Sequence, residues 1–207
     1  MTRIYALAAI VTVISGLLIA LALIWLNRED AQFASCGVGQ VAGNDQIGGP
    51  FTLIDENGNT VSEQDVITDL TLLYFGYIYC PNICPLDNAR NGDAVRLLED
   101  RGVSINPVFV TVDPERDTPE ALRDFTDLFH ERLLGLTGSD AQIDQAKQAY
   151  KVYGAKAPGE EDEEFYLVDH TTLSYLMHPE HGLLAFFRRD VTSEQMADQI
   201  ACVADAL

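Results

Sequence analysis

Hydrophobic and polar positions divide the chain into three parts. No charged residue occurs over residues 4–26, a run of 23 that exceeds the ~20 needed to cross a bilayer. Tyr5 and Trp25 lie near the two ends of this run, where aromatic side chains favour the membrane interface. The pattern predicts three segments: a membrane anchor formed by one N-terminal transmembrane helix over 1–27, a polar, glycine-rich linker over 28–48, and a folded domain over 49–207.

A cleaved signal peptide is the alternative for the first segment. Its apolar core would span about 7–15 residues and precede small residues at a cleavage site. Residues 33–36 resemble a lipoprotein cleavage site, but the charged residues 28–30 separate them from the apolar run. We therefore favour a retained anchor. Its orientation is weakly encoded, because Arg3 precedes the run and Arg28 follows it.

Alternating elements in the folded domain predict an α/β sandwich. The run from Thr71 to Tyr77 is apolar, as is typical of a strand at the buried centre of a sheet. Asn57-Gly58 predicts the turn of a hairpin between residues 51–54 and 60–61. Further strands are predicted over 105–112, 165–169, 173–177 and 183–188, and helices over 85–100, 118–130, 139–153 and 193–206.

Two cysteines follow the predicted central strand. Cys80 and Cys84 are four positions apart, so a loop or helical turn between them lets both sulfurs point to one side. Pro85 predicts a helix start, whose free N–H groups and dipole stabilise thiolates. Because thiolates bind Cu(I) and attack disulfides, we expect this pair to be metal-competent and redox-active. Two inert buried cysteines are the weaker alternative.

Four motifs occur in order along the chain: Gly49-Pro50-Phe51-x-Leu53-x-Asp55-x-x-Gly58, Tyr74-Phe75-Gly76-Tyr77-x-x-Cys80-Pro81-x-Ile83-Cys84-Pro85, Val110-Thr111-Val112-Asp113-Pro114-x-Arg116-Asp117-Thr118-Pro119 and Tyr166-Leu167-Val168-Asp169-His170-Thr171. Together they resemble the Sco/SenC family of membrane-tethered copper chaperones for the CuA site of cytochrome c oxidase. The resemblance implies a thioredoxin-like sandwich with an inserted hairpin and helices, and a bound copper ion. It also implies that Cys80, Cys84 and His170 are the metal ligands.

The partners that the resemblance implies are the CuA-bearing oxidase subunit, other copper carriers and thioredoxin-like reductants. The implied location is a bacterial inner membrane with the domain in the periplasm; a mitochondrial inner membrane is the weaker alternative. One departure is Asn82, where family members commonly carry Asp. The lost charge is expected to alter redox tuning or partner contact more than metal binding.

Histidines have different expected roles. His170 ends a predicted strand and is expected to project at the same sheet edge as the cysteine loop, where imidazole suits Cu(I) as a third ligand. On position alone a structural histidine would be favoured; the motif singles it out. His130 is expected on the surface at a helix end. His178 and His181 are expected in a solvated turn, with a secondary metal site as the weaker alternative. For Asp113, orienting a ligand and forming a turn are weighed evenly.

The remaining cysteines, Cys36 and Cys202, leave two alternatives open. Their pairing would spare Cys80 and Cys84, and two unpaired thiols are the other outcome.

Charge excludes one class of partner. Without Arg3, Arg28, Glu29 and Asp30, residues 31–207 keep 11 of the 13 Lys+Arg and 30 of the 32 Asp+Glu, so the net charge of −19 belongs to them. Nucleic-acid binding is excluded, since phosphate contacts need basic side chains. The acidic residues 160–164 are expected to form a solvated loop.

Three functions are ranked from these observations. A copper carrier without catalytic turnover comes first, and a thiol–disulfide oxidoreductase that keeps the oxidase's copper-ligand cysteines reduced comes second. A peroxidase is a distant third, because that type needs Thr three residues before its reactive cysteine, where this chain has Tyr77.

Overall fold

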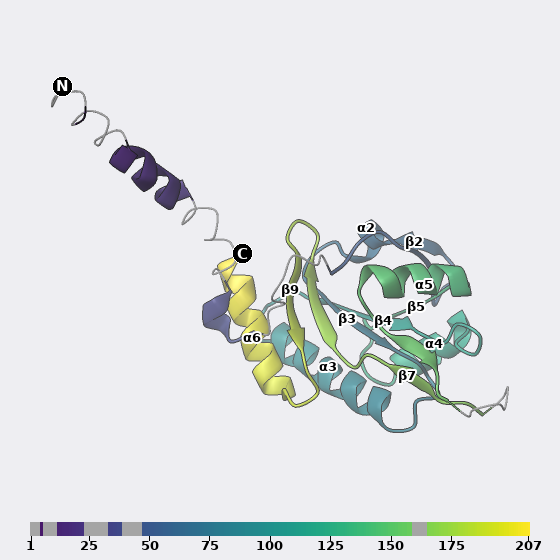
Figure 1. Ribbon diagram of the computed structural model, residues 1–207. Helices are drawn as coiled ribbons and strands as arrows, with labels where there is room; N and C mark the ends of the chain where they lie inside the picture. Colours follow the sequence, from purple (N-terminus) through teal and green to yellow (C-terminus); the bar gives the residue numbers. More distant parts are fainter. Residues whose placement is uncertain (1–4, 6–11, 23–32, 39–46, 159–164) are drawn as a thin grey trace.

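A seven-stranded sheet forms the centre of the domain (Figure 1). The structure, a computed structural model, describes residues 5, 12–22, 33–38, 47–158 and 165–207. Strands run in the order β2-β1-β5-β4-β3-β8-β9, and β3, β4 and β5 are parallel to one another. Parallel neighbours need crossover connections, which α3 and α4 supply.

The elements follow one another along the chain as η2 (Ala34–Cys36), β1 (Thr52–Asp55), β2 (Thr60–Ser62), α2 (Glu63–Val66), β3 (Thr71–Gly76), α3 (Ile83–Asp100), β4 (Asn106–Thr111), α4 (Pro119–Thr126), β5 (Leu134–Thr137), α5 (Asp140–Ala149), β6 (Gly154–Lys156), β7 (Val168–His170), β8 (Ser174–His178), β9 (Gly182–Phe187) and α6 (Ser193–Ala206). This order confirms the predicted α/β class.

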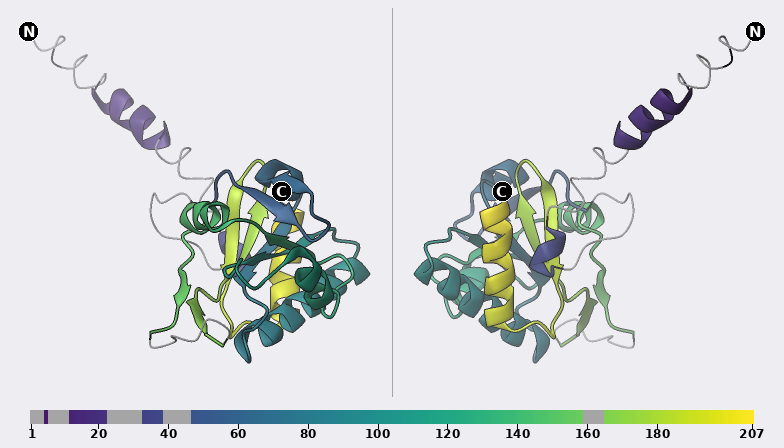
Figure 2. Two further views of the ribbon diagram at one scale, coloured as in Figure 1. Left: turned by 90° about the vertical axis from the view of Figure 1, so that its right-hand side faces the viewer. Right: turned by 90° about the vertical axis from the view of Figure 1, so that its left-hand side faces the viewer.

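Two hydrophobic clusters cover the two faces of β3. Leu72 packs in a cluster with α3 and α6, which lie side by side on one face (Figures 1 and 2). Leu73 belongs to the other cluster, which includes Ile143 of α5. All six residues of β3 are buried, as the apolar run predicts.

Several predicted boundaries are wrong. The helix predicted over 118–130 ends at Thr126, and the one over 139–153 ends at Ala149. The strand predicted over 165–169 is instead β7 (Val168–His170), which pairs with β6 in a separate two-stranded sheet. His170 therefore does not project from an edge of the main sheet, because its hairpin stands outside that sheet.

The N-terminal segments lie partly outside the described residues. Residues 12–22 are helical, while 1–4, 6–11, 23–32 and 39–46 of the predicted anchor and linker lie outside the described residues, as do the acidic residues 160–164. None of the helices in the described residues has the length and hydrophobicity to cross a bilayer.

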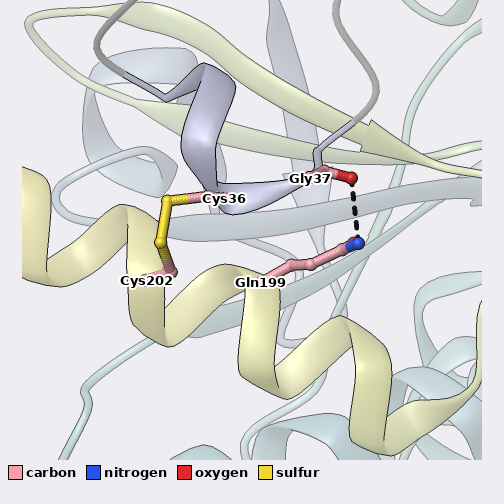
Figure 3. The surroundings of a disulfide bond; sticks show 4 residues. All are labelled: Cys36, Gly37, Gln199 and Cys202. Carbon is pink, nitrogen blue, oxygen red and sulfur yellow. Dashed lines mark hydrogen bonds between the residues drawn. A yellow bond between two sulfur atoms is a disulfide. The ribbon is translucent and has the colours of Figure 1, made fainter.

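Part of the predicted linker packs on the domain. Cys36 of η2 forms a disulfide with Cys202 of α6, which confirms one of the two alternatives for these cysteines (Figure 3). Beside it, the Gln199 side-chain amide donates a hydrogen bond to the Gly37 carbonyl over 2.9 Å. Residues 33–38 are thus held against α6.

Candidate metal centre

Cys80 and Cys84 meet where β3 passes into α3. Cys80 lies in the loop between them, and Cys84 is the second residue of α3. The Cys84 backbone N–H donates to the Cys80 sulfur over 3.2 Å, so the N-terminus of α3 points at this sulfur. Pro85 occupies the third helical position, where its missing N–H leaves no hydrogen bond unmade. Both thiols are free and buried.

The two sulfurs hold one proton between them. The pKa of Cys80 is lowered to about 3, chiefly by the hydrogen bond from the Cys84 thiol and further by the backbone N–H groups of Cys84 and Ile83. The pKa of Cys84 is raised by the same hydrogen bond to Cys80 and by burial. A metal ion that binds both sulfurs must therefore displace the Cys84 proton.

Gly76 makes room for this arrangement. A Cβ atom at Gly76 would lie 2.8 Å from the Cys84 sulfur and 2.9 Å from Cε1 of Tyr74. Real Cβ atoms do not approach other atoms so closely, so the end of β3 needs glycine for Cys84 to occupy its position.

His170 brings a nitrogen to the two sulfurs. Its Nδ1–H donates to the Thr171 carbonyl over 2.9 Å, which leaves the Nε2 lone pair facing the Cys84 sulfur at 3.4 Å. The ring of Tyr77 packs edge-on against the imidazole at 5.6 Å between centroids, and that of Tyr74 at 6.3 Å. A backbone acceptor on Nδ1 is the usual way in which a protein fixes the tautomer of a ligating histidine.

The three sequence-predicted residues come together. The ligand atoms of Cys80, Cys84 and His170 all lie within 4.8 Å of one another, and within the described residues they form the one group of three or more potential ligands. Two thiolates and an imidazole suit a soft ion such as Cu(I).

A polar network that the sequence did not reveal adjoins Cys84, and two of its members, Tyr74 and Asp87, are buried. The Tyr74 hydroxyl lies 4.0 Å from the Cys84 sulfur and donates to Asp87 over 3.0 Å. Asp87 also accepts from Arg189 Nε at 3.3 Å. These residues occupy β3, α3 and the segment after β9, and no local pattern in the sequence connects them.

The other histidines lie outside this centre. The prediction that His130 lies on the surface is wrong: α4 ends before it, and the side chain is buried 3.4 Å from Glu99. His178 and His181 flank the β8–β9 turn with ring centroids 5.0 Å apart. Because His178 Nδ1 accepts the Glu180 N–H, its Nε2 carries the proton and offers no lone pair to a metal.

Asn82 and Asp113 are two further residues that the sequence analysis singled out. Asn82 is exposed at the N-cap of α3, and its side chain makes no capping hydrogen bond. Asp113 is buried after β4, and its carbonyl accepts from the N–H groups of Arg116 and Asp117, as the turn alternative expects. Its carboxylate also accepts a hydrogen bond from the hydroxyl of Tyr166, on the segment that leads to His170. The turn is therefore confirmed, and the role in orienting a ligand stays a prediction.

A family model described as SCO1/SenC matches residues 39–205, more than half of the chain. The chain belongs to the SCO1/SenC family. Protein SenC of Rhodobacter capsulatus is 48% identical over 203 residues, which cover 98% of this chain and 90% of that protein.

Two solved structures share the fold. Arabidopsis thaliana ScoI with copper bound has a TM-score of 0.71 and 38% identity, covering 77% of this chain and 99% of that one. Yeast Sco1 with copper bound has a TM-score of 0.74 and 33% identity, covering 79% of this chain and 91% of that one. The thioredoxin-like fold that the family resemblance implied is thereby confirmed.

Proposed function

We propose that this chain is a copper carrier, anchored in a bacterial inner membrane, which delivers copper to the CuA site of cytochrome c oxidase from the periplasmic side. The observation that carries the proposal is the convergence of Cys80, Cys84 and His170 within 4.8 Å. Copper in the structures of two relatives supports the choice of ion. The disulfide Cys36–Cys202 fits an oxidising compartment such as the periplasm.

Delivery to a protein partner requires an accessible face at the metal centre. Large apolar side chains are exposed on the segments that carry the ligands. Tyr79, next to Cys80, is 57% exposed, Leu86, two residues after Cys84, is 64% exposed, and Phe165, before β7, is 72% exposed. Exposed apolar groups are typical of protein interaction sites, which fits docking of the acceptor around the centre.

A second candidate function is thiol–disulfide exchange. The low pKa of Cys80 makes its sulfur a thiolate that can attack a partner's disulfide. Cys84 then loses its proton and attacks the Cys80 sulfur of the mixed disulfide, which releases the partner as a dithiol and leaves Cys80–Cys84 oxidised. This step passes two electrons to the partner, so a reductant of the thioredoxin type must restore the pair.

Copper stoichiometry tests the first function. The reduced domain, residues 31–207, loaded without oxygen, should hold one Cu(I) per chain. Cys80→Ser and Cys84→Ser should each abolish binding, because a hydroxyl is a poor ligand for a soft ion. His170→Ala should weaken binding in a folded protein, whereas the control His178→Ala should leave it unchanged. Full copper affinity in all three ligand variants would remove the basis for this assignment.

Oxidase maturation in cells separates the two functions. Imidazole is needed for the copper centre and not for exchange, so His170→Ala should fail to mature the oxidase under limiting copper while still exchanging disulfides in vitro. Normal maturation with this variant would place the reductase function first.

A further inference from the structure

The hairpin that carries His170 stands apart from the main sheet. Strands β6 and β7 pair only with each other among the described strands. The position of His170 relative to the sulfurs therefore depends on contacts that dock this hairpin onto the body of the domain. The cysteines need no such docking, because their loop connects β3 directly to α3.

Arg116, in the loop between β4 and α4, lies between the hairpin and the cysteine loop. Its guanidinium carbon is 3.5 Å from the ring centroid of Tyr166, on the segment that leads into β7. The same carbon is 4.8 Å from the ring of Tyr79 and 5.8 Å from that of Tyr77, both in the cysteine loop. One side chain thus contacts the aromatic residues on both sides of the centre.

Asp113 fixes the orientation of this arginine. Arg116 Nε donates to Asp113 Oδ2 over 2.6 Å, and Nη2 lies 2.6 Å from the same oxygen. The other carboxylate oxygen, Oδ1, accepts from the Tyr166 hydroxyl, also at 2.6 Å. The arginine side chain is only 12% exposed. Arg116 and Tyr166 therefore stack directly on each other and both donate hydrogen bonds to the carboxylate of Asp113. Because the arginine is mostly buried, water screens these interactions little.

Two further contacts help to hold the hairpin in place. Lys156 of β6 places its ammonium 3.9 Å from the Tyr166 ring and 2.9 Å from Glu115. The Val168 backbone N–H, two residues before His170, donates to the Tyr77 hydroxyl over 3.2 Å. The docking of the hairpin thus centres on Tyr166, whose contacts are with the loop after β4 and with β6.

We propose that Arg116 is a positioning residue for the metal centre: it holds the His170 hairpin against the cysteine loop and thereby sets the approach of Nε2 to the two sulfurs. The proposal rests on the proposed copper-binding function. Lysine cannot replace arginine here, since it keeps the charge but lacks the planar group that stacks on Tyr166 while donating sideways to Asp113. We call the contacts of Arg116 with Tyr166 and Asp113 the clamp. Loss of the clamp would leave the two thiols in place and move the imidazole of His170 away from them.

A double-substitution cycle with copper tests this role. Arg116→Lys in the full chain should weaken Cu(I) affinity by about 10–100-fold, the effect typical of a group that supports a metal ligand. Combined with His170→Ala, it should weaken affinity no further than His170→Ala alone. A merely structural arginine would instead weaken binding equally in both backgrounds, and that outcome overturns the proposal, as does unchanged affinity in Arg116→Lys.

Two controls separate the clamp from general stability. Arg123→Lys changes an arginine whose hydrogen bonds go to Glu56 and Asn57, in the turn between β1 and β2, and not to the β6–β7 hairpin that carries His170. Copper affinity should therefore stay within twofold of the wild type. Tyr166→Phe keeps the ring and removes the hydroxyl bound to Asp113; it should weaken affinity less than Arg116→Lys and keep the fold.

Amide exchange in the metal-free chain tests the clamp without copper. In Arg116→Lys the segment 166–171 should exchange at least tenfold faster, while α6 stays as protected as in the wild type. Unchanged exchange over 166–171 overturns the clamp even where copper affinity falls. A wild-type chain that binds no Cu(I) refutes the proposed function, and the exchange measurement then still decides whether Arg116 holds the hairpin.

Discussion

Removing the disulfide between Cys36 and Cys202 should destabilise the domain strongly and leave the metal centre intact. The bridge joins residues separated by 166 positions, and Cys36 lies buried in the cluster between α3 and α6. In Figure 1, the C-terminal end of α6, which carries Cys202, lies on the opposite side of the domain from β7. Stability and copper binding are therefore expected to respond separately.

The magnitude follows from the length of the closed loop. For a separation of 166 residues, the chain-entropy relation gives the unfolded chain about 17 cal/mol/K more entropy without the bridge, or about 5 kcal/mol at 25 °C. For a domain of this size, 1 kcal/mol shifts Tm by about 2–4 °C, so Tm should fall by about 10–20 °C. Without the bridge, residues 33–38 keep the Gln199–Gly37 hydrogen bond and the packing of Phe33 and Val38.

Guanidinium unfolding of the copper-free protein is the assay. The variant is Cys36→Ala combined with Cys202→Ala, which places no new hydroxyl in the apolar cluster. Ala201→Ser, on the neighbouring position of α6, keeps the bridge and should lower the free energy of unfolding by less than about 1 kcal/mol. A loss below about 2 kcal/mol in the double variant would refute the loop-closure reasoning, and a tenfold loss of copper affinity would refute the separation of bridge and centre.

Two further predictions concern the buried residues Gly76 and Asp117. Gly76→Ala should lower copper affinity at least tenfold and cost about 1–3 kcal/mol of stability, because the new methyl group would lie 2.8 Å from the Cys84 sulfur. Competition titration measures the affinity and thermal unfolding measures the stability. Unchanged copper affinity would contradict this prediction. Burial raises the pKa of Asp117 from 3.8 to about 7, above its value in the unfolded chain. The folded state therefore holds an extra proton between these values, and about 4 kcal/mol of stability present below pH 4 should be lost as the pH rises through 7. Asp117→Asn should flatten this pH dependence in urea unfolding; an identical slope in both proteins would exclude Asp117 as its source.

The sequence correctly predicted those helices and strands that neighbouring residues determine. The apolar run gave β3 to within one residue, and α6 begins at the predicted Ser193, after a capping box between Thr192 and Gln195. The end of α4 has no such signal, so the helix was extended too far and His130 was placed on the surface. Strand β5 (Leu134–Thr137) was missed because four residues with a central glycine carry little periodicity.

Long-range contacts explain what the sequence left open at the site. The cysteine pair could be inferred from spacing, since the turn between Cys80 and Cys84 is local. His170 was identified only through its motif, because its distance to the sulfurs depends on how a hairpin docks. Arg116 and Asp87 were missed as supporting residues, since their partners lie on other elements and charged residues ordinarily indicate solvent exposure.

The three proposed ligands are attached to the domain in different ways, and this difference bears on the choice between carrier and reductase. Both sulfurs are fixed by β3 and α3, so a substitution there affects copper binding and disulfide exchange alike. The imidazole is supplied by a hairpin outside the main sheet, which exchange does not need. Variants of the hairpin and of Arg116 should therefore lose copper delivery while keeping exchange, whereas cysteine variants lose both. If cells carrying Arg116→Lys mature their oxidase as poorly as those lacking Cys84, copper delivery is the function that the oxidase requires.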